Sequence, residues 1–261
     1  MNRPNNTEQT NTANPTTAEI LAEVERRRTA ARRSANRPHG SIIILIDRII
    51  FWLSKHWLAV FNTFSFLYVA LPILAPVLMH LGANWPAMII HTIYKPLCHQ
   101  MPHRSFFLFG PKLTYTLPEL VQWLGTSEEL TPAIATFVGN ETVGYKMALC
   151  QRDIAIYGMI FIAGLAYVLL RRRWKIASLP WWAYIGLGVL PMLLDGGYQL
   201  ISYAIYIFWP QGPITPREST PVLRMITGAL FGLATVWLAY PLLQETMEEF
   251  HENLHQRFGW E

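Results

Sequence analysis

Charged residues are scarce in this sequence. Asp, Glu, Lys and Arg make up 15% of its 261 residues, whereas an ordinary soluble domain carries roughly 25%. Hydrophobic residues make up 52%. A chain this poor in charge has too few water-facing groups to cover its surface. The composition therefore predicts a protein that exposes much of its surface to lipid, and not a soluble enzyme.

Several signatures of soluble function are also missing. Two cysteines, Cys98 and Cys150, are too few for a disulfide framework. The sequence has no G-x-x-x-x-G-K-[ST] loop, no G-x-G-x-x-G after a strand, no G-x-S-x-G elbow and no C-x-x-C, so nucleotide hydrolysis and thioredoxin-type exchange lack support. No basic surface is interleaved with aromatic residues, and we expect no nucleic-acid partner. The first forty residues lack the apolar region of a signal peptide, so we expect the first transmembrane helix to direct insertion.

The sequence does contain long apolar runs, which predict an all-α fold. We expect a polytopic bundle of about four transmembrane helices with additional interfacial helices, because each run approaches the ~20 residues that cross a bilayer. The expected spans are Trp57 to about Leu81, Ile154 to Leu170, Leu179 to about Ser202, and Pro221 to Leu243. Residues 41–56 include two basic residues and one acidic residue. A central charge costs a spanning helix roughly 2.5–3.5 kcal/mol, so this run is interpreted as an interfacial amphipathic helix.

Two basic segments indicate an orientation. Arginines cluster between residues 26 and 33 and again from Arg171 to Arg173, and the positive-inside rule places both clusters in the cytoplasm. We therefore expect a multi-pass protein of the plasma membrane with both termini in the cytoplasm. Its expected parts are a disordered basic tail at 1–40, a transmembrane domain at 57–243 with an extracytoplasmic loop at 82–153, and a cytoplasmic tail at 244–261. Either 41–56 or 85–109 could instead enter the membrane.

Polar residues converge at the outer end of the expected spans. Asp195 lies about 24 Å along its span, at ~1.5 Å per residue in a core ~30 Å thick, and Arg224 lies at a similar depth. Ionisable residues in spans are rare and usually paired or functional, so these two form a candidate ion pair. The pair either locks two helices together, as the G-x-x-x-G spacing of Gly228 and Gly232 favours, or handles a ligand. The polar cluster at this depth consists of Arg104, Arg152, Asp195, Gln199, Arg217, Arg224 and Thr227.

Sulfur and imidazole side chains gather in the loop before the second span. Cys98, His99 and His103 lie close together, and Cys150 and Asp153 follow about fifty residues later. These residue types bind zinc or copper, although their spacing matches no standard finger. In an oxidising compartment, the two cysteines could also form a disulfide that fastens the loop to the second span, or remain free thiols. These alternatives stay open, and the sequence assigns no cofactor.

One motif has the form of a catalytic zinc site. His251-Glu252-Asn253-Leu254-His255 matches H-E-x-x-H, the helical zinc pair with a glutamate base. Only six residues follow His255, so no downstream third ligand is available, and Phe258 stands where the extended motif requires glycine. We interpret this segment as a solvated charged helix.

Several blocks of residues resemble one known family. They are Cys98-His99-Gln100, Arg104-Ser105-Phe106 and Gly110, then Cys150-Gln151-Arg152-Asp153 and Ile156-Tyr157-Gly158, then Pro191, Asp195-Gly196 and Gln199, and last Glu218-Ser219, Leu223-Arg224, Thr227-Gly228 and Phe231-Gly232. From roughly residue 60 to 243, they resemble the domain of unknown function 2085 family of small prokaryotic membrane proteins. The resemblance implies a compact multi-helix domain in a prokaryotic plasma membrane, and it implies no activity. Many members carry a cysteine where this chain has Asp153, which weakens the idea of a three-cysteine site here.

Three hypotheses for function follow. The first is a non-enzymatic membrane protein whose outer polar cluster binds an ion, a lipid headgroup or a partner. The second is a metal-binding or thiol redox protein that uses Cys98, His99 and Cys150. The third is a component of a transporter, although four spans without an inverted repeat are few for a carrier. The expected partners are the lipid bilayer and either another membrane protein or a second copy of this chain.

Overall fold

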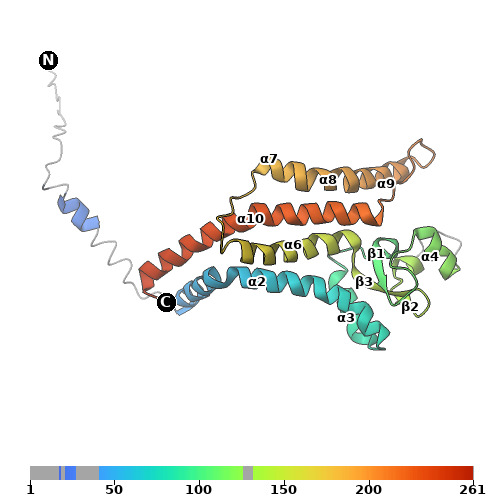
Figure 1. The fold of residues 1–261 in the computed structure, drawn as a ribbon, viewed down its shortest axis with the longest axis horizontal. Coiled ribbons are helices and arrows are strands. Elements are labelled where there is room, and N and C mark those ends of the chain that lie inside the picture. Colours follow the sequence, from blue (N-terminus) through green and yellow to red (C-terminus); the bar gives the residue numbers. More distant parts are fainter. Residues whose placement is uncertain (1–17, 19–20, 28–40, 126–131, 261) are drawn as a thin grey trace, which may run out of the picture. The chain divides into compact units, whose positions relative to one another are not determined.

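The computed structural model describes residue 18 and residues 21–27, 41–125 and 132–260. Within them, four helices are long and apolar enough to cross a membrane: Ile42–His80, Gln151–Leu170, Trp181–Phe208 and Pro221–Phe258. Each overlaps one of the four expected spans, and the predicted all-α, polytopic fold is confirmed (Figure 1). Most of the expected basic tail at 1–40 lies outside the described residues.

The first long helix, α2, spans Ser41–His80 without interruption. No glycine or proline occurs between residue 41 and Pro72, so nothing in the sequence ends a helix at the expected boundary after residue 56. Pro72 and Pro76 lie inside the helix. The expected amphipathic segment is therefore the first part of α2, and its position at the membrane interface stays a prediction.

The closest helix packing is between α6 (Gln151–Leu170) and α10 (Pro221–Phe258). A Cβ atom at Gly228 would lie 2.7 Å from the carbonyl oxygen of Arg152, and one at Gly232 would lie 2.4 Å from that of Ile156. Only glycine allows these backbones to approach so closely. The G-x-x-x-G spacing therefore has the packing role expected of it, although its partner is the second span and not the third.

The third span consists of three short α-helices joined by wider turns. α7 (Trp181–Tyr184), α8 (Leu190–Met192) and α9 (Tyr198–Phe208) are linked by π-helical turns at Ile185–Val189 and Leu193–Gly197. Pro191 has no N–H to donate to the regular helical pattern. Such turns often occur at functional sites, and the second one contains the buried Asp195.

The last helix continues far beyond the expected end of its span. α10 runs through residues 244–258, expected as part of a polar tail, and ends where Gly259 adopts a left-handed conformation with φ of 67°. The segment is mostly polar, with apolar residues only at Met247, Phe250, Leu254 and Phe258, which is compatible with a solvated helix. No glycine or proline interrupts it before Gly259.

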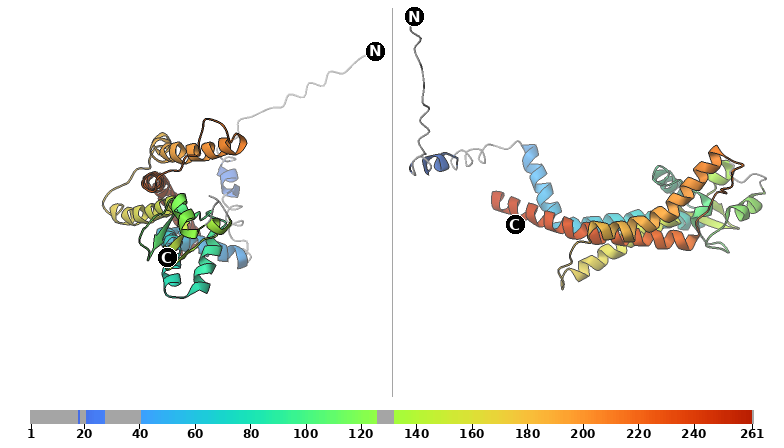
Figure 2. Two further views of the ribbon diagram at one scale, coloured as in Figure 1. Left: turned by 90° about the vertical axis from the view of Figure 1, so that its right-hand side faces the viewer. Right: turned by 90° about the horizontal axis from the view of Figure 1, so that it is seen from above.

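The segment between the first two spans folds into a small cap at one end of the helices (Figure 2). It contains α3 (Asn84–Tyr94), β1 (Ser105–Leu108), α4 (Leu117–Leu124), α5 (Pro132–Ala135), β2 (Gly139–Asn140) and β3 (Gly144–Cys150). The strands form an antiparallel sheet in the order β1-β3-β2. At 11 residues, α3 is too short to cross a bilayer. The sheet was not predicted, because strands of two to seven residues carry little alternation.

Two apolar cores hold the helices together and join them to the cap, and a third, around Phe107 and Leu120, lies within the cap. An aromatic core at the end of the bundle away from the cap includes Trp57, Tyr167 and Tyr240. A second core joins α2, α3 and β3 through Ala75, Tyr94 and Leu149, and the buried Cys98 belongs to it. The second core fixes the position of the loop that carries the cysteines and histidines.

Candidate functional site

A cavity of about 590 Å³ lies where the cap meets the ends of the spans. Its walls come from the turn after α3, from the start of α6 and from the third and fourth spans. The lining residues are Leu97, Cys98, His99, Gln100, Met101, His103, Arg104, Cys150, Arg152, Asp153, Met192, Gly196, Gln199, Leu200, Tyr203 and Arg224. Polar residues that are distant in sequence therefore share one site.

The pairing of β1 with β3 brings the segment around Cys98 and the segment around Cys150 together. Ser105 in β1 is opposite Cys150 in β3, and β3 continues directly into α6. The side chain of Gln151, fully buried at the first position of α6, donates a hydrogen bond of 3.2 Å to the carbonyl oxygen of Ser105. The turn Pro102–Arg104 is thereby held beside the N-terminus of α6.

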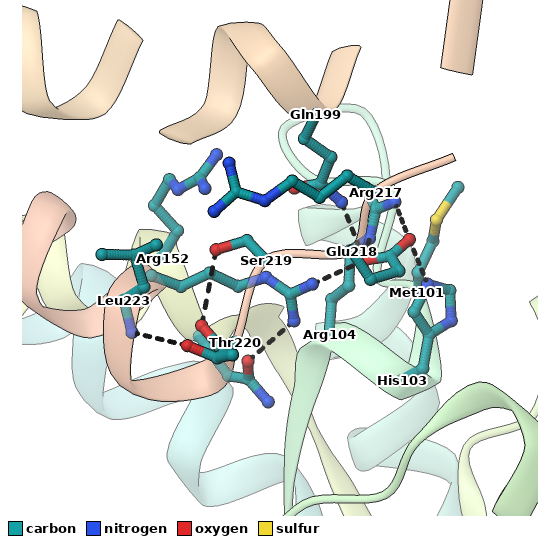
Figure 3. A network of polar contacts seen from close by, with 12 residues as sticks. Met101, His103, Arg104, Arg152, Gln199, Arg217, Glu218, Ser219, Thr220 and Leu223 are labelled. Atoms are coloured by element: carbon teal, nitrogen blue, oxygen red, sulfur yellow. Dashed lines mark hydrogen bonds and ion pairs between the residues drawn. The ribbon is translucent and has the colours of Figure 1, made fainter. Parts of the chain in front are cut away.

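Glu218, in the connection between the third and fourth spans, is the centre of the polar network (Figure 3). Its carboxylate accepts hydrogen bonds from side chains of three separate elements. The donors are Arg104 at 2.5 and 3.2 Å, Gln199 at 2.8 Å, Tyr203 at 2.5 Å and Arg224 at 2.6 Å. The Nε2 atom of His103 lies 3.4 Å from the same carboxylate. Glu218 therefore ties the cap to the third and fourth spans.

The charge of Glu218 is held by these neighbours. Partial burial alone would raise the pKa of the Glu218 carboxyl, but hydrogen bonds from His103, Arg104 and Tyr203 outweigh burial and lower the pKa well below its usual range. Glu218 is therefore an anion at neutral pH and offsets part of the positive charge of Arg104 and Arg224.

The predicted ion pair between Asp195 and Arg224 is wrong, because each residue pairs with a different partner. Asp195 pairs with Arg152 at 2.5 Å and accepts a hydrogen bond of 2.7 Å from the hydroxyl of Ser219. Arg224 is bound by Glu218 and by the Gln151 side-chain oxygen at 3.0 Å. Both residues do lie at the same end of the bundle, but rotation about the helix axes directs them to different neighbours.

The remaining members of the predicted polar cluster have mixed roles. Gln199 joins the Glu218 network, as described above. Thr227 is buried, and its hydroxyl donates to the carbonyl oxygen of Leu223 at 2.8 Å, which is a local helix contact. The exposed Arg217 lies over the ring of Tyr198, with 5.1 Å from its guanidinium carbon to the ring centroid.

The two cysteines and Asp153 form a compact group in the cavity wall. The ligand atoms of Cys98, Cys150 and Asp153 all lie within 4.8 Å of one another, and Cys150 Sγ donates to Asp153 Oδ2 at 3.2 Å. Both cysteines are free thiols in the structure, so their pairing as a disulfide stays a prediction. The interaction of the thiols raises the pKa of Cys150, assisted by burial, and lowers that of Cys98.

Neither histidine of the predicted ligand set joins this group within the described part of the chain. His99 is exposed, whereas His103 is buried and faces Glu218. The histidines of the H-E-x-x-H motif make ring contacts: His251 stacks on Phe51 at 4.6 Å between ring centroids, and the rings of His251 and His255 are stacked 6.4 Å apart.

Lys146, which sequence reasoning missed, is buried and bonds to Gln100, a residue that lines the cavity. Its ammonium group donates to the carbonyl oxygen of Gln100 at 2.6 Å, and burial lowers its pKa to about 8. The side chain of Gln100 in turn bonds to His91, whose pKa burial also lowers. The signal in the sequence is that Lys146 is a charged residue directly before the uncharged run Met147 to Cys150.

Charge balance could have pointed to Glu218, the other missed residue. The predicted cluster contained four arginines and one aspartate, so further acidic residues were required to neutralise it. Glu218 and Ser219 lie directly before the fourth span, and in the sequence they stand out only as members of the family blocks. Gln151 was likewise noted only there.

Comparison with known proteins supports the family resemblance and the membrane fold. Residues 141–238 match the family described as predicted membrane protein (DUF2085), which confirms the resemblance seen in the sequence. The matched segment contains Cys150, Asp195 and Glu218, but it does not reach Cys98. An uncharacterised protein of Methanocaldococcus jannaschii is 26% identical over 213 residues, which cover 79% of this chain and 99% of that protein. No solved structure matches the chain.

Proposed function

We propose that this chain, whose residues 141–238 match a family of predicted membrane proteins, binds an anionic group in the cavity between its cap and its spans. The observation that carries the proposal is the placement of charge. Arg104, Arg152 and Arg224 line the cavity, whereas their partners Asp195 and Glu218 are not among the lining residues. These two carboxylates hold the guanidinium groups in place, and the three arginines outnumber Asp153, the carboxylate that does line the cavity.

A donor without a partner supports an anionic ligand. The Nε atom of Arg152 is buried and has no hydrogen-bond partner within the described residues. Leaving a buried polar group unsatisfied costs about 1–3 kcal/mol, so such a group calls for an explanation. Arg152 lines the cavity. A bound oxyanion accepts hydrogen bonds from a donor of this kind, and arginine suits phosphate and carboxylate geometry in particular.

Charge asymmetry supports an orientation in which the cavity faces outward. Arg171 to Arg173 follow the end of α6, while Arg152 near its start lines the cavity. Under the positive-inside rule, the arginine end is cytoplasmic and the cavity end is extracytoplasmic. An epitope inserted after Gly125 should bind antibody on intact cells, and one inserted after Trp174 should bind only after permeabilisation. The reverse pattern would show that the orientation is wrong.

The ligand of this proposal is a phosphate-type group, which belongs either to a free anion or to a lipid headgroup. Purified full-length protein in a non-ionic detergent is heated with inorganic phosphate in one arm and with short-chain phosphatidylglycerol in the other, at constant ionic strength. A ligand that binds only the folded state at about 100 times its Kd adds about 2.7 kcal/mol of stability. We expect a rise in Tm in at least one arm, and the responding arm identifies the source.

The variant Arg152→Gln should remove the ligand-induced rise in Tm. This result is expected whether or not the substitution changes the Tm measured without ligand. Arg172→Gln is the matched control, because Arg172 is exposed in the basic segment at the other end of α6. It should keep the full rise. A rise in neither arm, or an equal rise with Arg152→Gln, would rule out anion binding at this site.

A further inference from the structure

We propose that Cys98, Cys150 and Asp153 form a binding site for a thiophilic divalent cation of the Zn²⁺ class, with one coordination position open to the cavity. The three ligand atoms lie within 4.8 Å of one another, and Cys150 Sγ is 3.2 Å from Asp153 Oδ2. Zinc–ligand distances of about 2.0–2.3 Å in a tetrahedron place ligand atoms roughly 3.5–3.8 Å apart. Small side-chain rotations therefore suffice to surround an ion.

The ligands are carried by rigid elements. Cys98 is buried in the core formed by α2, α3 and β3, and its backbone N–H donates to the Tyr94 carbonyl oxygen at 3.0 Å. Cys150 ends β3 and is the residue before the first turn of α6, and Asp153 lies within that turn. Ligands fixed in this way lose little freedom when an ion binds, which favours a specific site.

The ligand types select the class of metal. Two thiolates are soft ligands that favour Zn²⁺ over Mg²⁺ or Ca²⁺, which prefer oxygen. Three protein ligands with a fourth position left for water or another small ligand is the pattern of open zinc sites. All three residues line the cavity, so the fourth position faces its interior.

The surrounding charge is compatible with such an ion. Two thiolates and one carboxylate carry three negative charges, and a divalent cation leaves one. Arg152 lines the same cavity, and Lys146 lies close enough to Cys98 for their charges to interact. The N-terminus of the 20-residue α6 adds a partial positive charge beside Cys150. These groups offset the remaining negative charge.

Metal binding is measured on full-length protein purified in detergent with a reductant. After incubation with Zn²⁺ and desalting, elemental analysis should find about one ion per chain. Co²⁺ should produce the thiolate-to-metal absorption expected of a tetrahedral sulfur site. Cys98→Ser, Cys150→Ser and Asp153→Asn should each weaken Zn²⁺ binding by more than the roughly 10–100-fold that loss of a supporting neighbour costs.

His99→Ala is the matched control, because His99 lines the cavity beside Cys98 yet is not among the three ligands. It should leave Zn²⁺ affinity unchanged. Should a cysteine variant fail to fold, protection of both thiols from maleimide by Zn²⁺ in the unaltered protein gives a second measurement. Zn²⁺ that fails to bind or to protect the reduced thiols would overturn the proposal, as would loss of binding with His99→Ala. Anion binding is measured separately with phosphate and without metal, so failure of one proposal leaves the other standing.

Discussion

Glu218→Gln tests the network that joins the cap to the spans. The substitution keeps the size of the side chain and removes its charge, so Arg104 and Arg224 lose their shared counter-ion. Arg224 is the more sensitive partner, because its side chain is 4% exposed, against 27% for that of Arg104. The Glu218 side chain is 32% exposed, so this ion pair is neither fully buried nor fully solvated.

The magnitude follows from these exposures. Removing one partner of a buried ion pair costs about 3–5 kcal/mol, and an exposed pair contributes about 0–1 kcal/mol. Glu218 is partly exposed, and Arg224 keeps the hydrogen bond that it donates to Gln151, so the expected loss lies between these limits, at about 2–3 kcal/mol. For a chain of this size, the corresponding fall in Tm is about 4–12 °C.

Thermal unfolding in detergent, followed by the fluorescence of the ten tryptophans, measures this loss. Glu141→Gln is the matched control, because Glu141 is exposed in the turn between β2 and β3, and it should change stability by no more than about 0.5 kcal/mol. In double-mutant cycles with Arg224→Gln, Glu218→Gln should show a larger coupling energy than Asp195→Asn. A larger coupling with Asp195 would refute the observed pairing and restore the one expected from depth alone.

Two further predictions concern stability at low pH and the packing of α6 against α10. Because the folded-state pKa of Glu218 lies below its ordinary value near 4.5, its stabilising contribution is complete above that pH and is lost as the pH falls further. Unfolding measured from pH 6 to pH 3 should show this loss, and Glu218→Gln should reduce it; an unchanged slope would contradict the assignment. Gly232→Ala should destabilise the protein by about 1–3 kcal/mol, because its methyl group meets the backbone of α6, whereas Gly158→Ala has open space and should not. Equal stability of the two glycine variants in thermal unfolding would show that the backbones do not approach as described.

The spans could be predicted because their signal is local. A run of about twenty apolar residues has few alternatives to a spanning helix, and all four runs are helical here. The boundaries were less certain, since neither residue 56 nor Leu243 is followed by a residue that stops a helix. α2 and α10 therefore extend beyond the limits drawn from hydropathy.

The pairing of charged residues could not be predicted, because it depends on how the helices are rotated and on where the connecting loops run. Counting residues gives depth along a helix, which correctly brought Asp195 and Arg224 to one end of the bundle. Depth does not give the rotation of a helix or the path of a connecting loop. Glu218 lies in such a loop, where no periodicity indicates the direction of its side chain, yet it binds Arg224.

Arg152 contacts one neighbouring membrane segment with its backbone and another with its side chain. Its carbonyl oxygen lies against Gly228 of α10, and its guanidinium group lies against Gly196 and binds Asp195 in the third span. The position of this guanidinium therefore depends on how three membrane segments are arranged. Any ligand that binds Arg152 in one arrangement only must, by reciprocity, stabilise that arrangement. Occupancy of the cavity and the geometry of the bundle are thus thermodynamically linked through a single side chain.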